Sequence, residues 1–275
     1  MQILVVVAVA LALTEVAVLV TSIYLHRGLA HRSLTIHPAA DVLFRTILWL
    51  TTGQARQEWV AVHRKHHAFT DCAGDPHSPR LLGFWRVQLL NVYYYIVACR
   101  DRASVAKYAP DLAPDRLDRV VFSRGTLGIA IGVSALCVLM GPRAGLLAGG
   151  LHAVLYVVGV APAINALGHW RGGRNYENTA RNSMVLAWVT GGESLHNNHH
   201  AHPRAPKFSV RTWEFDPSWP VIRALAALSV LAIAETPVRL ARAPSLARFP
   251  SHGTARRQGS ARQTPAAHAN GWSDA

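Results

Sequence analysis

The sequence predicts an all-α integral membrane protein, with about three to four transmembrane helices and a helical cap on the cytoplasmic side. Three observations lead to this fold class. Of the 275 residues, 51% are hydrophobic, and the mean hydropathy of +0.16 is high for a water-soluble protein. Apolar residues gather in stretches of the length needed to cross a bilayer, which is about 20 residues. Nine histidines lie just past the ends of apolar segments.

Three apolar stretches are expected to span the membrane: residues 2 to about 24, about 121–140 and about 144–164. The first is not read as a cleavable signal peptide, because it lacks a basic start and a small-residue cleavage site. A shorter apolar run, 42–52, contains Arg45 and predicts an interfacial or re-entrant helix. Residues 1–240 are expected to form the membrane domain. Residues 241–275 are basic, lack an apolar period and predict a disordered tail.

The nine histidines form three short clusters and one outlier. They read His26-Arg-Gly-Leu-Ala-His31, His63-Arg-Lys-His66-His67 and His196-Asn-Asn-His199-His200, with His169 apart. In the second and third clusters, the i, i+3, i+4 spacing places three rings on one face of a helix. His26 and His31 are about 140° apart on a regular helix. They converge only if the helix ends or bends, which Gly28 allows.

This set of side chains predicts a metal site. Neutral imidazole is the commonest protein ligand for zinc, copper and iron. One ion takes at most about six ligands, so the set implies two metals, or one metal with spare ligands. The clusters hold no cysteine or carboxylate. That composition suits iron or another first-row metal and does not suit a structural zinc site.

The membrane segments predict that all nine histidines lie on one side. If 42–52 does not cross, the first two clusters share a side, and the helical hairpin 121–164 returns the chain to it. Of the 28 Lys and Arg residues, only Arg124 and Arg143 fall outside 26–120 and 168–275. The positive-inside rule therefore makes this side cytoplasmic, and we expect a bacterial cell membrane. The net charge of +13 is read as topology, not nucleic-acid binding, since no binding motif is present.

The three clusters resemble, in order and spacing, the histidine boxes of the membrane fatty-acyl desaturases: H-x4-H, H-x2-H-H and H-x2-H-H. The resemblance extends from about Leu25 to Leu231. Asn165-Ala-Leu-Gly-His169 resembles the family's N-x3-H element. Residues 192–200 resemble its G-E-G-x-H-N-x-H-H stretch, with Ser194 in place of a glycine. Further matches are Glu58-Trp59 before the second box and Asp75-Pro76-His77 after it.

The resemblance implies a di-iron enzyme that uses O2 and two electrons to insert a cis double bond into a saturated long-chain acyl group. The nine histidines are then the iron ligands, and Asn165 reaches iron through a water. Outer carboxylates orient such rings through their second nitrogen. The candidates for this role are Glu193, Glu58, Asp71 and Asp75. The candidates for the walls of an acyl tunnel are Trp49, Trp59, Leu48 and Trp188.

Partners follow from the same resemblance. The substrate is acyl-CoA or a phospholipid chain, and the apolar Val60-Ala61-Val62 keeps the phospholipid open, because vertebrate acyl-CoA members tend to carry a cation there. No cytochrome-like domain is visible, so electrons are expected from a ferredoxin, a rubredoxin or a cytochrome b5 type of protein. A basic face attracts an acidic carrier. Arg204, Lys207 and Arg211 are candidates for that contact.

Three other functions stay open. A related di-iron hydroxylase or ketolase shares the histidine boxes, although the N-x3-H element favours the desaturase. A membrane transporter for transition metals belongs to a different class and would carry its histidines within the spans. A non-catalytic homologue is expected to have lost some ligands.

Overall fold

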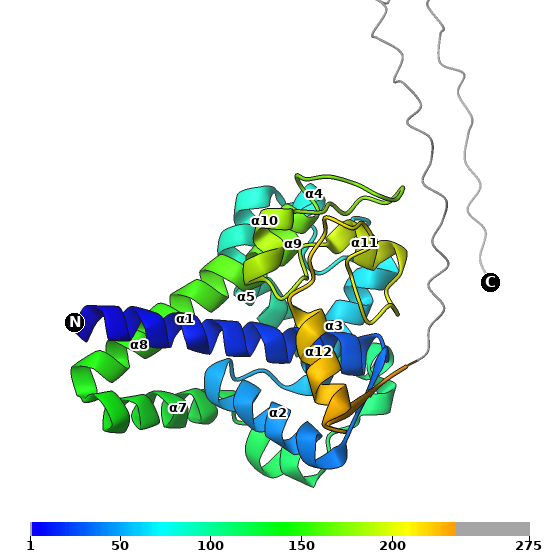
Figure 1. Ribbon diagram of the computed structural model, residues 1–275. Coiled ribbons are helices and arrows are strands. Elements are labelled where there is room, and N and C mark those ends of the chain that lie inside the picture. Colours follow the sequence, from blue (N-terminus) through cyan, green and yellow to red (C-terminus); the bar gives the residue numbers. More distant parts are fainter. Residues whose placement is uncertain (1, 235–275) are drawn as a thin grey trace, which may run out of the picture. The chain divides into compact units, whose positions relative to one another are not determined.

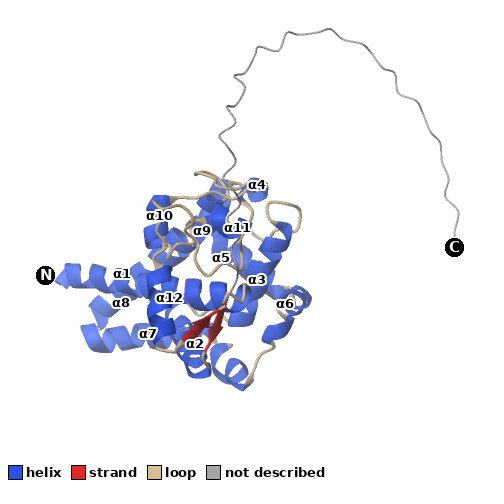
Figure 2. Ribbon diagram, turned by 45° about the vertical axis from the view of Figure 1, so that its right-hand side comes forward, coloured by secondary structure: helices blue, strands red, loops and turns tan. Residues whose placement is uncertain are grey.

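The computed structural model describes residues 2–234, and almost all of its regular structure is helical (Figure 1, Figure 2). The predicted tail, 241–275, lies outside the described residues and stays a prediction. The first elements are α1 Gln2–Val20, η1 Thr21–Ala30, β1 Leu34–Ile36, α2 Pro38–Thr51, α3 Arg56–Phe69, α4 Pro79–Leu82, α5 Phe84–Arg100, α6 Arg102–Tyr108 and η2 Pro110–Leu112. They are followed by η3 Asp118–Phe122, α7 Gly125–Met140, α8 Pro142–Val154, η4 Leu155–Val160, α9 Ala161–Gly168, α10 Met184–Val189, α11 His196–Ala201, α12 Ser218–Ala227 and β2 Leu231–Ile233.

Two helices in the described part of the chain are long and apolar enough to cross a membrane. α1 and η1 form one helix of 29 residues, Gln2–Ala30, and α8, η4 and α9 form another of 27 residues, Pro142–Gly168. The remaining predicted span is the apolar helix α7, which has 16 residues. Both α1 and α7 pack against α8, and the α7–α8 turn lies at the same end as the N-terminus (Figure 1). The number of crossings stays a prediction.

The first long helix widens where the sequence led us to expect an end or a bend. η1 is a π-helix, and the backbone N–H of His31 donates to the carbonyl of His26 at 3.0 Å. An i→i+5 turn stacks residues five apart, so the two histidines share one side of the helix. Gly28 serves close packing here. A Cβ atom at Gly28 would lie 3.2 Å from the carbonyl oxygen of Ile23 and 3.3 Å from Ile36.

α2 confirms the short helix predicted around 42–52 but starts earlier. Pro38 occupies its first turn, and the His37 ring accepts a hydrogen bond from the N–H of Ala39 at 3.2 Å. Its 14 residues are too few to cross a bilayer. α2 packs directly against α7. A Cβ atom at Gly128 would overlap the carbonyl oxygen of Trp49, so only glycine permits this approach.

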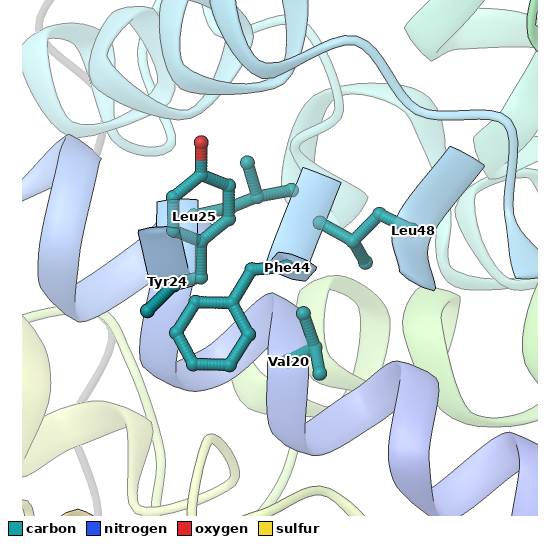
Figure 3. Close-up of a cluster of buried hydrophobic side chains, with 6 residues drawn as sticks. Val20, Tyr24, Leu25, Phe44 and Leu48 are labelled. Carbon is teal, nitrogen blue, oxygen red and sulfur yellow. The ribbon is translucent and has the colours of Figure 1, made fainter. Parts of the chain in front are cut away.

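A cluster of buried apolar side chains joins α2 to the end of the first long helix (Figure 3). Tyr24 and Phe44 meet with ring centroids 5.5 Å apart, and Leu48 lies beside them. The Tyr24 hydroxyl donates to Asp41 at 2.6 Å, which satisfies its polar end. This packing holds η1, and therefore the first histidine cluster, in place.

The two strands bring the end of the described chain back to the first long helix. β1 and β2 pair antiparallel, with Leu34 opposite Ile233 (Figure 2). α12 packs against β2 and η1. The segment that follows the third histidine cluster is thereby anchored beside the first cluster.

Candidate metal centre

The nine histidines meet at one place and divide into two groups. Within each group the ligand nitrogens lie within 4.8 Å of one another. The first group contains His26, His31, His63, His67 and His199. The second group contains His66, His169, His196 and His200. Sequence reasoning predicted the convergence but not the division into five and four.

The helical spacing explains the division. On α3, His63 and His67 face the first group, and His66, which lies between them in sequence, faces the second. On α11, His199 joins the first group and His196 joins the second. Each helix therefore lies between the groups and supplies both of them. An i, i+3, i+4 pattern does this because its members fan across one helix face.

The ring nitrogens stand at distances typical of neighbouring ligands. In the first group, the Nε2 atoms of His26 and His67 lie 3.1 and 2.9 Å from that of His199. In the second group, the Nε2 atoms of His66 and His196 lie 3.1 and 3.0 Å from that of His169. Two nitrogens about 2.1 Å from one ion and at right angles to each other are about 3 Å apart.

Three predicted carboxylates hold the second nitrogen of a ring. Asp75 accepts from His66 Nδ1 at 3.0 Å, and Asp71 accepts from His169 Nδ1 at 2.9 Å. Glu193 Oε2 lies 2.5 Å from His26 Nδ1. Burial raises the pKa of Asp71, but the hydrogen bonds and charge from His169, together with hydrogen bonds from Ser78 and Thr179, hold that pKa below its ordinary value.

These hydrogen bonds decide which ring nitrogen is available. Because Nδ1 of His66 and of His169 donates to an aspartate, the Nε2 atom of each neutral ring carries a lone pair. Burial lowers the pKa of His169, which favours its neutral ring. The Nε2 atoms of His66 and His169 lie 3.1 Å apart, and those of His169 and His196 lie 3.0 Å apart. Neutral imidazole nitrogens that converge in this way are the donor set that a metal ion requires, so the residues fit a metal ion.

Glu58, the fourth predicted carboxylate, is placed differently. Its Oε1 atom forms an ion pair with Arg102 at 2.5 Å, on the exposed side of α3. The structure thus brings Glu58 to an arginine and not to a histidine of the boxes. Glu58 nevertheless lines the same cavity as His63, which is described below.

A buried charge network that the sequence did not reveal supports Glu193. The side chain of Arg27 is fully buried, and its guanidinium lies 3.3 Å from Glu193 and 3.0 Å from Asp216. It also lies over the ring of Phe208, 3.8 Å from the centroid. Arg27 follows His26 at the end of an apolar helix, which was the available signal. Asp216 carried none.

Two asparagines of the third cluster, also missed, fix α11. Asn197 Oδ1 accepts from the backbone N–H groups of Asn175 and Tyr176 at 2.7 and 2.8 Å. Asn198 Nδ2 donates to Glu214 at 2.8 Å. Both asparagines are buried. They tie α11 to the loops around it and so set the direction of its histidines.

A cavity of about 520 Å³ adjoins both histidine groups. His26 and His63 of the first group and His196 of the second line it. Asn165 also lines it and donates to Asn91 Oδ1 at 3.1 Å. The water-mediated role of Asn165 stays a prediction. The other walls come from α1, α3, α5, α7, η4 and α9, and are mostly apolar.

Of the four predicted tunnel residues, Trp59 lines this cavity, and its ring stacks on His63 with centroids 5.0 Å apart. The structure places the other three elsewhere. Leu48 is part of the apolar cluster in Figure 3, and Trp49 donates from its indole N–H to the Arg124 carbonyl at 2.9 Å. Trp188 is 61% exposed and packs on Phe215. Hydrophobicity alone does not say which side of a helix faces a cavity.

Fold and site define a helical, membrane-associated protein with a histidine-rich centre suited to metal. Comparison with known proteins agrees, since the family model described as "Fatty acid desaturase" matches residues 2–237. The chain belongs to this family.

Several characterised proteins are similar to the chain. Delta-9 acyl-lipid desaturase 2 of Arabidopsis thaliana is 33% identical over 211 residues, which cover 72% of this chain and 64% of that protein. The sn-1 stearoyl-lipid 9-desaturase of Synechocystis sp. is 27% identical over 74% of this chain and 64% of that protein. The hex-5-enoyl-[acyl-carrier protein] acetylenase of Moorena producens is 28% identical, over 76% and 70% respectively. The chain thus spans just under two thirds of the first of these relatives.

Proposed function

We propose that this protein is an O2-dependent desaturase that inserts a cis double bond into a saturated long-chain acyl group, at a centre of two irons. The observation that carries the proposal is the cavity that touches both histidine groups. An apolar chain in it comes within reach of two metal positions at once. Membership of the desaturase family and the acyl-lipid desaturases among the relatives support the same reaction.

The reaction removes two hydrogen atoms from adjacent methylenes. These, with two electrons and two protons, reduce O2 to two waters while the C=C bond forms. Bound irons supply the activation of O2, which no side chain provides. The protein's own residues do the rest. Asp71, Asp75 and Glu193 hold the rings of three histidines, and Asn165 is proposed to act through a water.

The cavity walls bind the chain without polar contacts. Each buried methylene contributes roughly 0.8 kcal/mol, so an acyl chain is held firmly by burial alone. Trp59 stacks on His63, so it is proposed to pack against the part of the acyl chain whose methylenes react. Because successive methylenes are chemically alike, the bond position follows from how far the chain enters.

Electrons are proposed to come from a separate acidic carrier of the ferredoxin, rubredoxin or cytochrome b5 type. Arg204 and Lys207 are exposed and Arg211 is partly buried, just after the third histidine cluster. This basic segment suits an acidic partner, which charge steers to the protein. Changing Lys207 to Glu should raise the carrier concentration needed for half-maximal turnover, and added salt should do the same for the wild type.

The site is proposed to face the cytoplasm of a bacterial cell. The distribution of cations supports this, because only Arg143 lies at the turn between α7 and α8. Reporter fusions after Asp71 and within the turn at Gly141 should report opposite sides of the membrane. The same side for both would contradict the proposed crossing of α7.

A metal transporter is the alternative of a different class. It requires ligands along a path through the membrane, whereas the nine histidines gather at one end of the long helices. A hydroxylase or ketolase keeps the same site and differs in its product. No contact in the described residues favours either, so the product decides.

The test is the lipid profile of a host that expresses the chain under air, measured by gas chromatography–mass spectrometry. We expect cis-monoenes of C16 or C18 chains that the host lacks. The matched control is His66→Ala, which removes a ring of the second group and should abolish the product. A hydroxylated product without monoene would overturn the desaturase. Monoene formation that is unchanged in the control would overturn the site.

A further inference from the structure

Helix α5 shows an unusually apolar outer face. α5 is kinked at Leu90, and Trp85 and Leu89 before the kink and Val92 and Ile96 after it are all exposed. Exposed arginines, Arg86 and Arg100, stand near its two ends. An apolar stripe with flanking cations is typical of a helix that lies in a lipid interface. This face therefore fits the bilayer.

The cavity opens at this face. Val92 and Ile96 of α5 line the cavity and yet are 43% and 46% exposed. Across from them, Val157 of η4 also lines it and is 37% exposed. Thr126 and Ile129 of α7 combine lining and exposure in the same way. We take these five residues, which line the cavity and are also exposed, as the rim of an opening and call it the side opening.

The side opening lies between apolar helices. Val157 belongs to the long apolar helix Pro142–Gly168, and Ile129 belongs to the apolar helix α7. Where these helices cross the bilayer as expected, the solvent around the opening is hydrocarbon. Arg124, exposed and also lining the cavity, stands just before α7 begins, where a lipid phosphate would lie.

Two side-chain hydrogen bonds made by α5 lie at one end of the gap between α5 and η4. Pro162 has no N–H and cannot donate to the carbonyl of Val158, four residues before it. Gln88 Nε2 of α5 donates to it at 2.8 Å. Asn91 Oδ1 accepts from Asn165 at 3.1 Å. An unpaired carbonyl in lipid costs several kcal/mol, so the Gln88 tie fixes α5 at this point and leaves the opening beyond it.

We propose that the acyl chain enters the cavity sideways from the bilayer, through the side opening between α5 and η4, while it is still attached to a membrane phospholipid. This deepens the proposed function and rests on it for the reaction. The rim supplies apolar contacts for the chain, and Arg124 supplies a charge for the phosphate. The proposal commits to a phospholipid over a water-soluble thioester, which has no need of an opening within the membrane.

The test labels the cavity without turnover. The purified protein in phosphatidylcholine vesicles is offered phosphatidylcholine with a diazirine in the middle of one acyl chain, and labelled peptides are found by mass spectrometry. We expect label on peptides that contain Trp59 and Tyr156, which line the cavity. Val92→Trp and Val157→Trp fill the opening and should each lower this label about tenfold. Because the two substitutions lie on different helices, the test still stands if one of the variants fails to fold.

Matched controls use neighbours outside the lining. Val97 and Val158 are exposed valines on the same helices and do not line the cavity. Val97→Trp and Val158→Trp should change the label less than about twofold, as surface substitutions do. Wild-type label in both opening variants would overturn the proposal. So would cavity label from an acyl-CoA diazirine without any from the phospholipid. Loss of desaturation with intact labelling would refute the proposed function alone.

Discussion

Arg27 gives the sharpest test of how the site is held. It is fully buried between Glu193 and Asp216, at 3.3 and 3.0 Å. Arg27→Met keeps much of the side-chain volume over Phe208 but leaves two buried carboxylates without their cation. Breaking a buried pair in this way costs about 3–5 kcal/mol. For a chain of this size, that lowers the melting temperature by on the order of 10 °C.

The assay is thermal unfolding of the detergent-purified protein, followed by tryptophan fluorescence, with bound metal measured on the same samples. The control is Arg223→Met, an exposed arginine of α12 that should change stability by less than about 0.5 kcal/mol. Adding Asp216→Asn to Arg27→Met removes one stranded charge and should recover part of the loss. If Arg27→Met melts with the wild type and keeps its metal, the network does not hold Glu193 and His26 as argued.

Three further predictions concern the scaffold. Asn197→Leu leaves the backbone N–H groups of Asn175 and Tyr176 without their acceptor, Asn197 Oδ1. Chemical denaturation should then show that the free energy of unfolding falls by about 2–4 kcal/mol. Gly128→Val forces α7 away from α2 and should cost about 1–3 kcal/mol, while Gly150→Val, with nothing within 4 Å, should be nearly neutral by the same assay. Arg64 holds the pKa of Asp111 below its ordinary value, so Asp111→Asn should be less stable than the wild type at neutral pH, and the two should converge as pH falls below about 4. A difference that grows on acidification would show the opposite sign.

The sequence predicted the parts of the site that depend on local spacing. His63, His66 and His67 share a helix face whatever the rest of the chain does, and so do His196, His199 and His200. Long apolar stretches likewise predicted the helices that hold them. Asp75 follows His66 by nine positions and meets its ring, so local sequence could indicate that pair. Asp71 meets the ring of His169, 98 positions away, so its partner could not be read from local spacing.

The remainder depends on contacts between distant segments. Asp216 meets Arg27 across 189 positions, and no local pattern signals such a pair. Trp49 and Trp188 looked like tunnel walls because they are large and apolar. Which side of a helix faces a cavity is decided by neighbours such as α7, which meets Trp49 only because Gly128 leaves room. At His26 the sequence predicted an end or a bend of the helix. The spacing of His26 and His31 shows that a regular α-helix cannot bring the two rings together, but it does not show that a π-helix does so.

The most direct test of the central claim is the metal content of the purified wild-type protein, measured for all first-row metals by inductively coupled plasma mass spectrometry. Two histidine groups that share α3 and α11 predict about two iron atoms per chain. One metal per chain, or zinc or copper in place of iron, would contradict the account.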